Sequence, residues 1–224
     1  MKRIAIILAH PDDAELRCYG TICKYTDEGM ECFLLIASSG EHGIAIVDEQ
    51  VVNHTINTQT REAETLKAFE GLNTKIEFLH QKDGYMHYGR ELIHEIEERL
   101  LSILPEIVIT HYPDPLGADH QDHANIGKAV LNCISRIKSV RKVLLCDPLK
   151  TVKSHFIPNY FVDVTDYFER KIAALQCQIT QKGRYYLTED FHRNKGLYYA
   201  ANISYDLAEE GKIFEAYELY WCCE

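Results

Sequence analysis

The stretch ILAHPDDAE, residues 7–15, places an imidazole and three carboxylates directly after a run of aliphatic residues. These side chains belong to His10, Asp12, Asp13 and Glu15. Burying ionisable groups at the end of an apolar strand is costly unless they pair with each other or bind a metal ion. They therefore need partners from another part of the chain.

A second polar cluster lies between Ile107 and Gly127, in the stretch IVITHYPDPLGADHQDHANIG. It contains His111, Asp114, Asp119, His120, Asp122 and His123. The prolines and the glycine predict a loop that leads into a helix. The first cluster alone would also fit a helix N-terminus, because aspartate favours the positive end of the helix dipole. The second alone would also fit a surface loop, where such residues are common. Two such clusters behind two strands favour a shared site.

Two imidazoles and one carboxylate, from His10, His123 and Asp13, form the most economical set of metal ligands. Three protein ligands leave a position open for water, as in catalytic zinc sites. Bound zinc can lower the pKa of that water to about 7 and so supply a nucleophile at neutral pH. Asp12 would then act as a general base, and His120 would protonate a leaving group or stabilise an oxyanion.

The elements that must position these residues alternate along the chain. Apolar, β-branched runs predict buried strands over 3–10, 31–39, 76–80, 106–111 and 142–148. Apolar residues three and four apart predict helices over 14–29, 60–72, 90–104 and 123–139. This alternation predicts an α/β fold, a Rossmann-like doubly wound, mostly parallel sheet with helices on both faces. Such sheets bind ligands beyond the carboxyl ends of their strands, where both clusters lie.

The rest of the chain is expected to belong to the same domain, which spans residues 1–224. Residues 161–181 predict a short strand and a helix with Asp166 as a possible N-cap. The Tyr-rich segment from about residue 183 predicts no regular element. A chain of 224 residues suits one α/β domain with a substantial core.

Composition excludes several classes of protein. The formal net charge is −10 and no block of basic residues is present, which argues against a nucleic-acid partner. No segment approaches the roughly 18 apolar residues of a membrane span, and the N-terminus lacks a signal-peptide cleavage site. We therefore expect no membrane span and a cytoplasmic location. The 8 cysteines form no CxxC pair and are expected to be free thiols.

Several segments together resemble a known family. AHPDDAE followed by CYGT, then TREAE, KDG at 82–84 and GADHQDHANIGKAV are similar to the LmbE/PIG-L family of zinc-dependent N-acetylglucosaminyl de-N-acetylases. The resemblance runs in order from residue 4 to about residue 180. It implies a Rossmann-like fold, one zinc ion per subunit, homo-oligomers, and hydrolysis of an N-acetyl group from a small amino sugar or glycoside with release of acetate.

The resemblance also implies roles for individual residues. It assigns zinc to His10, Asp13 and His123, and it assigns the base role to Asp12. His120 becomes the acid or the oxyanion stabiliser, and Asp122 would orient His120 or raise its pKa. Glu15, in the first helical turn, would help to orient the ligand residues without binding the zinc itself.

Substrate contacts are expected from the same edge of the sheet. The resemblance places Arg61 near the substrate, although a surface pairing with Glu62 or Glu64 is an alternative. Ser39 and Glu41 follow the second predicted strand and should line the same rim.

Two departures from the family pattern bear on the substrate. Arg17 and Tyr19 stand where the family commonly has glycines, and their bulk is expected to narrow or reshape the pocket. A frequent family histidine is replaced near Gln178.

Two other functions remain open at this point. One is a non-catalytic, metal-stabilised sugar-binding protein. The other is a non-haem iron oxygenase, which also uses two histidines and a carboxylate, so Fe²⁺ or another divalent ion is an alternative to zinc. Such oxygenases usually have all-β barrels, whereas this chain alternates strand and helix.

Overall fold

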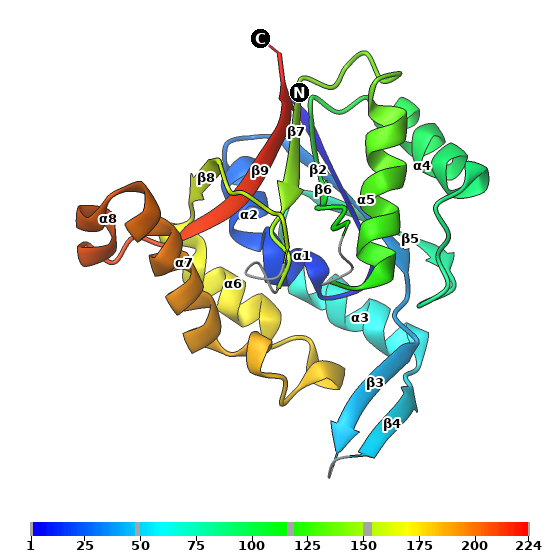
Figure 1. The fold of residues 1–224 in the computed structure, drawn as a ribbon, viewed down its shortest axis with the longest axis horizontal. Coiled ribbons are helices and arrows are strands. Elements are labelled where there is room, and N and C mark those ends of the chain that lie inside the picture. The colour runs from blue at the N-terminus through cyan, green and yellow to red at the C-terminus, as the bar shows by residue number, and fades with distance from the viewer. Residues whose placement is uncertain (1, 48–49, 116–118, 150–153, 224) are drawn as a thin grey trace.

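A computed structural model of the protein describes residues 2–47, 50–115, 119–149 and 154–223. The strands of its main sheet are β1 (Arg3–Leu8), β2 (Glu31–Ser38), β5 (Thr74–Gln81), β6 (Ile107–His111), β7 (Lys142–Cys146), β8 (Tyr160–Asp163) and β9 (Phe214–Cys222). They form a seven-stranded sheet in the order β5-β2-β1-β6-β7-β9-β8 (Figure 1). The first five strands of this order are parallel, and β9 runs antiparallel to both β7 and β8. The predicted α/β, mostly parallel sheet is therefore confirmed.

The direction in which the chain crosses the sheet reverses at β1. β2 and β5 lie on one side of β1, whereas β6 and β7 lie on the other. A crevice at the carboxyl ends of the strands is the usual ligand site at such a reversal. Ile7 of β1 pairs with Thr110 of β6, so the loops that follow these two strands begin side by side.

Helices cover both faces of the sheet (Figure 1). They are α1 (Asp13–Arg17), α2 (Tyr19–Asp27), α3 (Thr58–Ala68), α4 (Arg90–Ile103), α5 (Gln121–Ile134), α6 (Phe168–Leu175), α7 (Glu189–Ile203) and α8 (Tyr205–Glu209). Alternate residues of β1 face opposite layers. Ala5 and Ile7 pack in the core beneath α4 and α5, and Ile4 and Ile6 pack in the core beneath α2 and α6. All four residues are fully buried, which fixes β1 at the centre of the molecule.

The helix predicted over residues 14–29 is broken at Cys18. Cys18 has φ −145° and ψ 14°, outside the helical region, so α1 and α2 are separate helices. The first amides of α2 are satisfied by a distant carboxylate, because Gly20 N and Thr21 N donate to Glu215 of β9. The break reflects this tertiary partner and could not be read from local periodicity.

The segment from about residue 183 is more regular than the sequence predicted. It contains a 3₁₀ turn (Tyr185–Leu187), α7, α8 and the strand β9. Thr188 caps α7 by accepting a hydrogen bond from Phe191 N. The sequence obscures β9 because its residues alternate poorly and its pairing with β7 is formed only in the folded chain.

Three smaller differences concern local structure. β3 (His42–Val47) and β4 (Gln50–Thr55) form an unpredicted antiparallel hairpin that extends away from the main sheet (Figure 1). Asp166 lies in a 3₁₀ turn (Thr165–Tyr167), and Tyr167 precedes the first residue of α6, so Asp166 is not its N-cap. Within the described part of the chain, no helix combines the length and apolar character needed to cross a membrane.

Candidate metal centre and substrate cavity

A hydrogen bond joins the loops after β1 and β6 at the base of the site. The backbone N–H of Ala9 donates to Nε2 of His111, the last residue of β6, at 2.9 Å. The His111 ring is buried and stacks on the His123 ring, with centroids 4.1 Å apart. The two polar clusters of the sequence therefore lie together.

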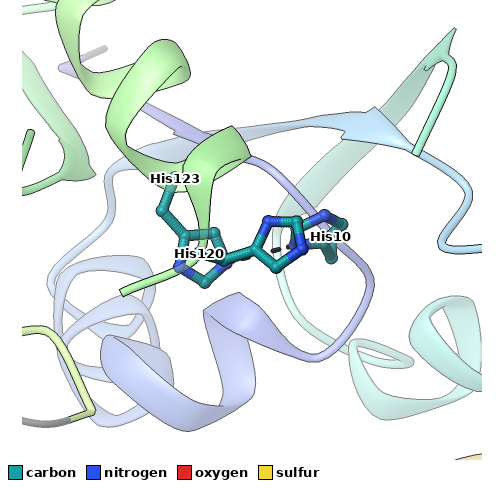
Figure 2. A group of neighbouring side chains, drawn as sticks. All are labelled: His10, His120 and His123. Atoms are coloured by element: carbon teal, nitrogen blue, oxygen red, sulfur yellow. Dashed lines mark hydrogen bonds between the residues drawn. The ribbon is translucent and has the colours of Figure 1, made fainter. Parts of the chain in front are cut away.

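The three residues expected to hold a metal converge, and Figure 2 shows two of them, His10 and His123, beside His120. His10 Nδ1 lies 3.1 Å from His123 Nε2. Asp13 completes the triangle, since its Oδ1 lies 3.3 Å from His123 Nε2 and its Oδ2 lies 3.5 Å from His10 Nδ1. Figure 2 shows that His10 comes from the loop after β1, whereas His120 and His123 come from the start of α5.

This donor set fits a tetrahedral divalent ion. Ligand atoms about 2.0–2.2 Å from zinc lie roughly 3.3–3.5 Å from each other at tetrahedral angles. Each imidazole also has a carboxylate at its other nitrogen. His10 Nε2 is 3.0 Å from Asp83 Oδ1, and His123 Nδ1 is 3.0 Å from Asp119 Oδ2. Such carboxylate–histidine pairs direct the remaining nitrogen lone pair at a metal.

Asp83, a candidate for the rim of the site from its sequence position, and Asp119 were not predicted to pair with the histidine ligands. Asp83 follows β5, a third strand that ends at the same edge of the sheet. Asp119 precedes His123 by four residues. A search for carboxylates that could bind the second nitrogen of each proposed histidine ligand would have selected both.

Charges in the site are compensated pairwise. Burial lowers the pKa of His10, but Asp122, Asp13 and Asp83 outweigh burial and raise that pKa well above its ordinary value. Burial raises the pKa of Asp13, yet the neighbouring His123 and His111 hold it well below its usual range. Asp13 is thus ionised, and a divalent cation would displace the protons from the imidazole nitrogens that face it.

Within the described residues, three overlapping groups could hold a metal ion. They are His10–His120–His123, His10–Asp83–His120–Asp122 and Asp13–His111–His123. Several atoms of these groups are already engaged by the backbone, since Gly84 N donates to Asp122 Oδ2 and His42 N donates to Asp83 Oδ2. His111 Nε2 is likewise occupied by Ala9 N. The set of His10, Asp13 and His123 takes its members from the first and third of these groups. Oδ2 of Asp13 accepts from His10 N, so Oδ1 is the oxygen of Asp13 that faces His123 Nε2.

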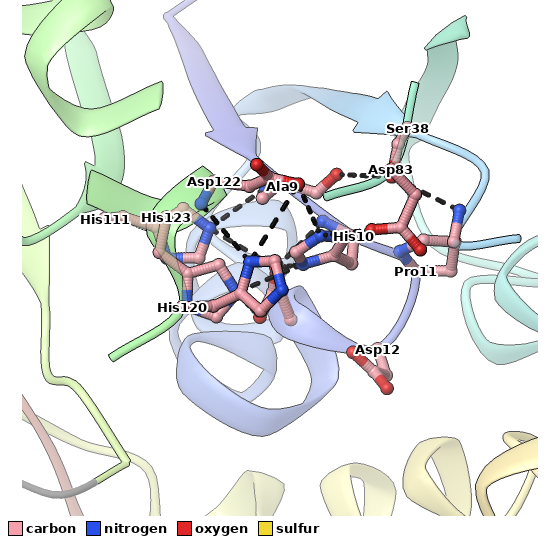
Figure 3. A network of polar contacts seen from close by, with 12 residues as sticks. Ala9, His10, Pro11, Asp12, Ser38, Asp83, His111, His120, Asp122 and His123 are labelled. Carbon is pink, nitrogen blue, oxygen red and sulfur yellow. Dashed lines mark hydrogen bonds and ion pairs between the residues drawn. The ribbon is translucent and has the colours of Figure 1, made fainter. Parts of the chain in front are cut away.

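Asp12 lies beside the ligands and is not one of them (Figure 3). Its φ of 95° is in the left-handed region, and its carboxylate points away from the histidines. Oδ2 of Asp12 accepts a hydrogen bond from Arg61 Nη2 at 3.1 Å, and Arg61 also donates to the carbonyl of Pro11. Burial raises the pKa of Asp12, and Arg61 opposes this rise. A carboxylate with a raised pKa suits a proton acceptor.

His120 presents a neutral imidazole to the cavity. Its Nδ1 accepts a hydrogen bond from the backbone N–H of Asp122 at 3.2 Å, which assigns the ring proton to Nε2. Burial lowers the pKa of His120, and positive charge on His10 and His123 lowers it further. The side chain is 45% exposed. His120 is therefore placed as a hydrogen-bond donor more than as a charged acid.

The carboxylate of Asp122 lies closer to His10 than to His120. Its Oδ2 lies 3.9 Å from His120 Nδ1 but only 3.3 Å from His10 Nε2, and it accepts from Gly84 N at 2.7 Å. The residue has no exposed surface. Asp122 thus holds His10 and the loop at Gly84 in place. Asp122 raises the pKa of His120, as expected, but burial and positive charge on His10 and His123 outweigh it and keep that pKa below its ordinary value.

Of the three predicted substrate-binding residues, only Arg61 lines the cavity. Its partner is Asp12, not Glu62 or Glu64. Ser39 instead donates to Glu62 and lies 3.1 Å from His80 Nδ1, and Glu41 accepts from Asp83 N. Their expected place on the cavity rim is therefore wrong, since these contacts hold the ends of neighbouring segments together.

Glu15 is buried away from the ligands. Its Oε1 accepts a hydrogen bond from Gln178 Nε2 at 2.7 Å, while Oε2 of Glu15 and Oε1 of Gln178 have no described partner. Burial raises the pKa of Glu15 to about 8. This buried carboxyl is hydrogen-bonded to Gln178, beyond the end of α6, and not to a proposed metal ligand, so the expected support of the ligands by Glu15 is not found.

Arg17 and Tyr19 do not narrow the cavity, contrary to expectation. Arg17 is buried behind the site, where it contacts Asp13 Oδ1 at 3.4 Å, Asp119 Oδ2 at 3.1 Å and His123 Nδ1 at 3.2 Å. Tyr19 packs in the core and donates to Ala68 O. Arg17 is thus an internal cation that fixes two carboxylates around His123.

The ligands open into a cavity of about 310 Å³. Its inner wall includes the three ligands with Asp12 and His120. Its outer wall consists of side chains from several segments: His42, Arg61, Leu149, Gln181, Arg184 and Tyr186. This volume lies at the lower end of the range of small-molecule sites.

Comparisons with known proteins place this site in a family. A curated diacetylchitobiose deacetylase of Thermococcus kodakarensis is 28% identical over 99% of this chain and 86% of the relative. A 4-oxalmesaconate hydratase of Pseudomonas putida is 23% identical over 91% of this chain and 86% of the relative. The crystal structure of the 4-carboxy-2-hydroxymuconate hydratase GalB from Pseudomonas putida superposes with a TM-score of 0.80 at 19% identity, covering 100% of this chain and 98% of that chain.

The family model described as PIG-L, GlcNAc-PI de-N-acetylase, matches residues 5–134, which include all three proposed ligands. More than half of the chain lies in this match. The protein therefore belongs to the PIG-L family, as its sequence resemblance predicted.

Proposed function

We propose that the protein is a zinc-dependent hydrolase that removes the N-acetyl group of a small amino sugar or glycoside. The observation that carries this proposal is the convergence of His10, Asp13 and His123 at a cavity that Asp12 also lines. Family membership and the similarity to a diacetylchitobiose deacetylase support the same chemistry.

His10, Asp13 and His123 would hold the zinc ion, with Asp83 and Asp119 orienting the two imidazoles. When bound, zinc supplies a Lewis acid and lowers the pKa of water toward neutrality. Iron(II) or another divalent ion could occupy the same donor set.

Asp12 acts as the general base in this proposal. It takes a proton from the attacking water while the water oxygen bonds to the acetyl carbon. Arg61 fixes the carboxylate through Nη2, so the acceptor oxygen has a defined direction. The C–N bond then breaks, Asp12 returns its proton to the departing nitrogen, and acetate and a free amine leave.

His120 stabilises the developing oxyanion. Its Nδ1 is occupied by Asp122 N, so the Nε2–H group is the one available to the substrate. A preorganised donor of this kind is typically worth about 10²–10³ in kcat. Because its ring is neutral, His120 is better suited to stabilise the oxyanion than to protonate the departing nitrogen.

The test is acetate and free-amine release from a panel of N-acetylated glycosides, with and without a chelator. Zinc-loaded protein should release equal amounts of both products, and the chelator should abolish release. Asp12→Asn should keep its zinc and lose about 10²–10⁴ in kcat, as expected for a general base. Asp166→Asn, an exposed carboxylate far along the chain, is the matched control. Substrate binding without product release would instead indicate a sugar-binding protein, and a requirement for oxygen would indicate an oxygenase.

A second candidate is the addition of water to a carbon–carbon double bond of a carboxylate-bearing substrate. The similarity to 4-oxalmesaconate hydratase favours it. Asp12 would again take the proton from water. The two reactions differ in their products, because a hydratase yields a single product that has gained one water and releases no acetate.

We also propose that the protein works in the cytoplasm as a homo-oligomer. All eight cysteines are free, five of them buried, which suits a reducing compartment. Light scattering of the purified protein measures the oligomeric state directly.

A further inference from the structure

Arg184 is a cation of the cavity wall for which the proposed reaction has no use. It is half-buried, lies in the turn just before the 3₁₀ segment 185–187, and lines the cavity with Gln181 and Tyr186. Its Nη1 donates to the hydroxyl of Tyr186, a neutral acceptor. Among the residues that the structure describes, Arg184 forms no ion pair with a carboxylate.

Arg61, the other guanidinium of this wall, is used differently. It is 5% exposed and paired with Asp12, so the charges of these two residues compensate each other. The outer wall therefore carries one positive charge in excess, that of Arg184.

The geometry of Arg184 and Tyr186 suits an anion. A guanidinium presents a planar fork of N–H groups that matches carboxylate and phosphate oxygens. Because the Tyr186 oxygen accepts from Arg184, its own hydroxyl proton is free to donate to the same anion. The guanidinium also lies 5.8 Å from the centre of the Tyr186 ring, which holds the two groups together.

We infer that Arg184 and Tyr186 form an anion subsite, and that the substrate is an N-acetylated amino sugar bearing a carboxylate or phosphate group. Only the N-acetylated amino sugar in this inference rests on the proposed function. The anion subsite does not depend on it. The cavity is large enough to hold more than an acetyl group, so an anionic substituent reaches the outer wall while the amide lies at the metal ligands.

The turnover experiment compares three substrates with the same sugar. Methyl N-acetylglucosaminide is neutral, N-acetylglucosamine 1-phosphate carries a phosphate, and N-acetylglucosaminyl malate carries carboxylates. Zinc-loaded wild type should favour at least one anionic substrate over the neutral one by about tenfold in kcat/KM, and the favoured anion identifies the group. Arg184→Gln should lower this preference about tenfold through KM, and Arg184→Lys should restore part of it.

Lys182→Gln is the matched control, because Lys182 is an exposed cation two residues away that does not line the cavity. It should leave the preference unchanged. An equal loss on neutral and anionic substrates in Arg184→Gln, or no preference in wild type, would overturn the subsite.

A binding experiment separates this inference from the proposed function. Calorimetry on metal-free protein measures the affinity for N-acetylglucosamine 1-phosphate and for the malate glycoside without turnover and without zinc as a competing anion site. The Kd of the preferred ligand should rise about tenfold in Arg184→Gln and stay constant in Lys182→Gln. If no substrate releases acetate but this difference is found, the deacetylase proposal fails and the anion subsite stands. If acetate is released but Arg184→Gln has the same Kd as wild type, the deacetylase proposal stands and the anion subsite fails.

Discussion

One carboxylate beside each of His10 and His123 fixes which ring nitrogen faces the proposed metal position. Asp119 accepts from Nδ1 of His123, and Asp83 accepts from Nε2 of His10. Burial raises the pKa of Asp119, but Arg17 and His123 outweigh burial and hold that pKa far below its usual value. Asp119 is therefore a charged anchor at the working pH of the protein.

Replacing this anchor should weaken metal binding without removing a ligand. Asp119→Asn keeps the shape of the side chain but loses the charge that orients His123. We expect zinc affinity to fall about 10–100-fold, the usual cost of losing such a partner. Competition with a chelating dye measures the affinity, and Asp166→Asn serves as the control. An unchanged affinity would mean that His123 is oriented by its stacking on His111 alone.

The buried imidazole of His192 should make the folding stability depend on pH. It is buried in α7, and its Nε2 donates to Tyr186 O at 2.9 Å, which supports the proposed anion subsite. Burial, with Lys171 and Lys195 nearby, lowers the pKa of His192 to about 2. Below an ordinary pKa of about 6.5 the unfolded chain binds a proton that the folded chain does not, so stability falls as the pH drops.

His192→Gln keeps a donor for Tyr186 O but cannot be protonated. Between pH 7 and pH 5 wild type should lose about 2 kcal/mol more of its unfolding free energy than this variant. Urea denaturation at both pH values gives the comparison. Parallel losses in the two proteins would contradict the lowered pKa.

At the scale of elements, the contact between α5 and β6 sets the position of His123. α5 approaches the end of β6 so closely that a Cβ at Gly127 would lie 2.5 Å from the backbone oxygen of His111. Gly127 follows His123 by one helical turn. The absence of a side chain at this point is what allows His123 to lie beside His10.

Gly127→Ala should move α5 away from β6. Overpacking of this kind costs about 1–3 kcal/mol, and zinc affinity should fall as well because His123 moves with the helix. Thermal unfolding and dye competition measure the two effects. Gly89→Ala is the control, since the nearest atom to its added Cβ would be His87 O at 3.9 Å. A Gly127→Ala protein with wild-type zinc affinity would show that α5 can shift without moving the site.

At the scale of the whole molecule, the proposed metal ligands connect parts of the chain that are distant in sequence. His10 lies in the loop after β1, Asp13 is the first residue of α1, and His123 belongs to α5, which follows β6. A metal ion that binds all three stabilises only the folded chain, so binding free energy adds to folding free energy.

Zinc at about one hundred times its Kd should therefore add about 2.7 kcal/mol to stability. For a chain of this size this corresponds to a rise in Tm of roughly 5–10 °C. Differential scanning calorimetry with zinc and with a chelator measures the shift. His123→Ala should show no zinc-dependent rise, and a rise equal to wild type in that variant would exclude the proposed ligand set.

The sequence by itself determined the parallel core and the proposed ligands. Strands with apolar runs such as 3–8 and 107–111 are buried on both faces, so their hydrophobic pattern is continuous and local. The polar residues that follow them, such as His10 and His123, interrupt that pattern at the one edge where ligands bind. Composition and spacing alone carry this information.

Only the tertiary structure decided the contacts that depend on distant partners. The break at Cys18, the strand β9, the support of the ligands by Asp83, and the pairings of Arg17 and Arg61 all join segments far apart in the chain. A charged side chain has the same local sequence signal whether it faces solvent or a buried carboxylate. Its role is fixed by which oppositely charged group the fold brings within hydrogen-bond distance, and that choice is made by the packing of the whole chain.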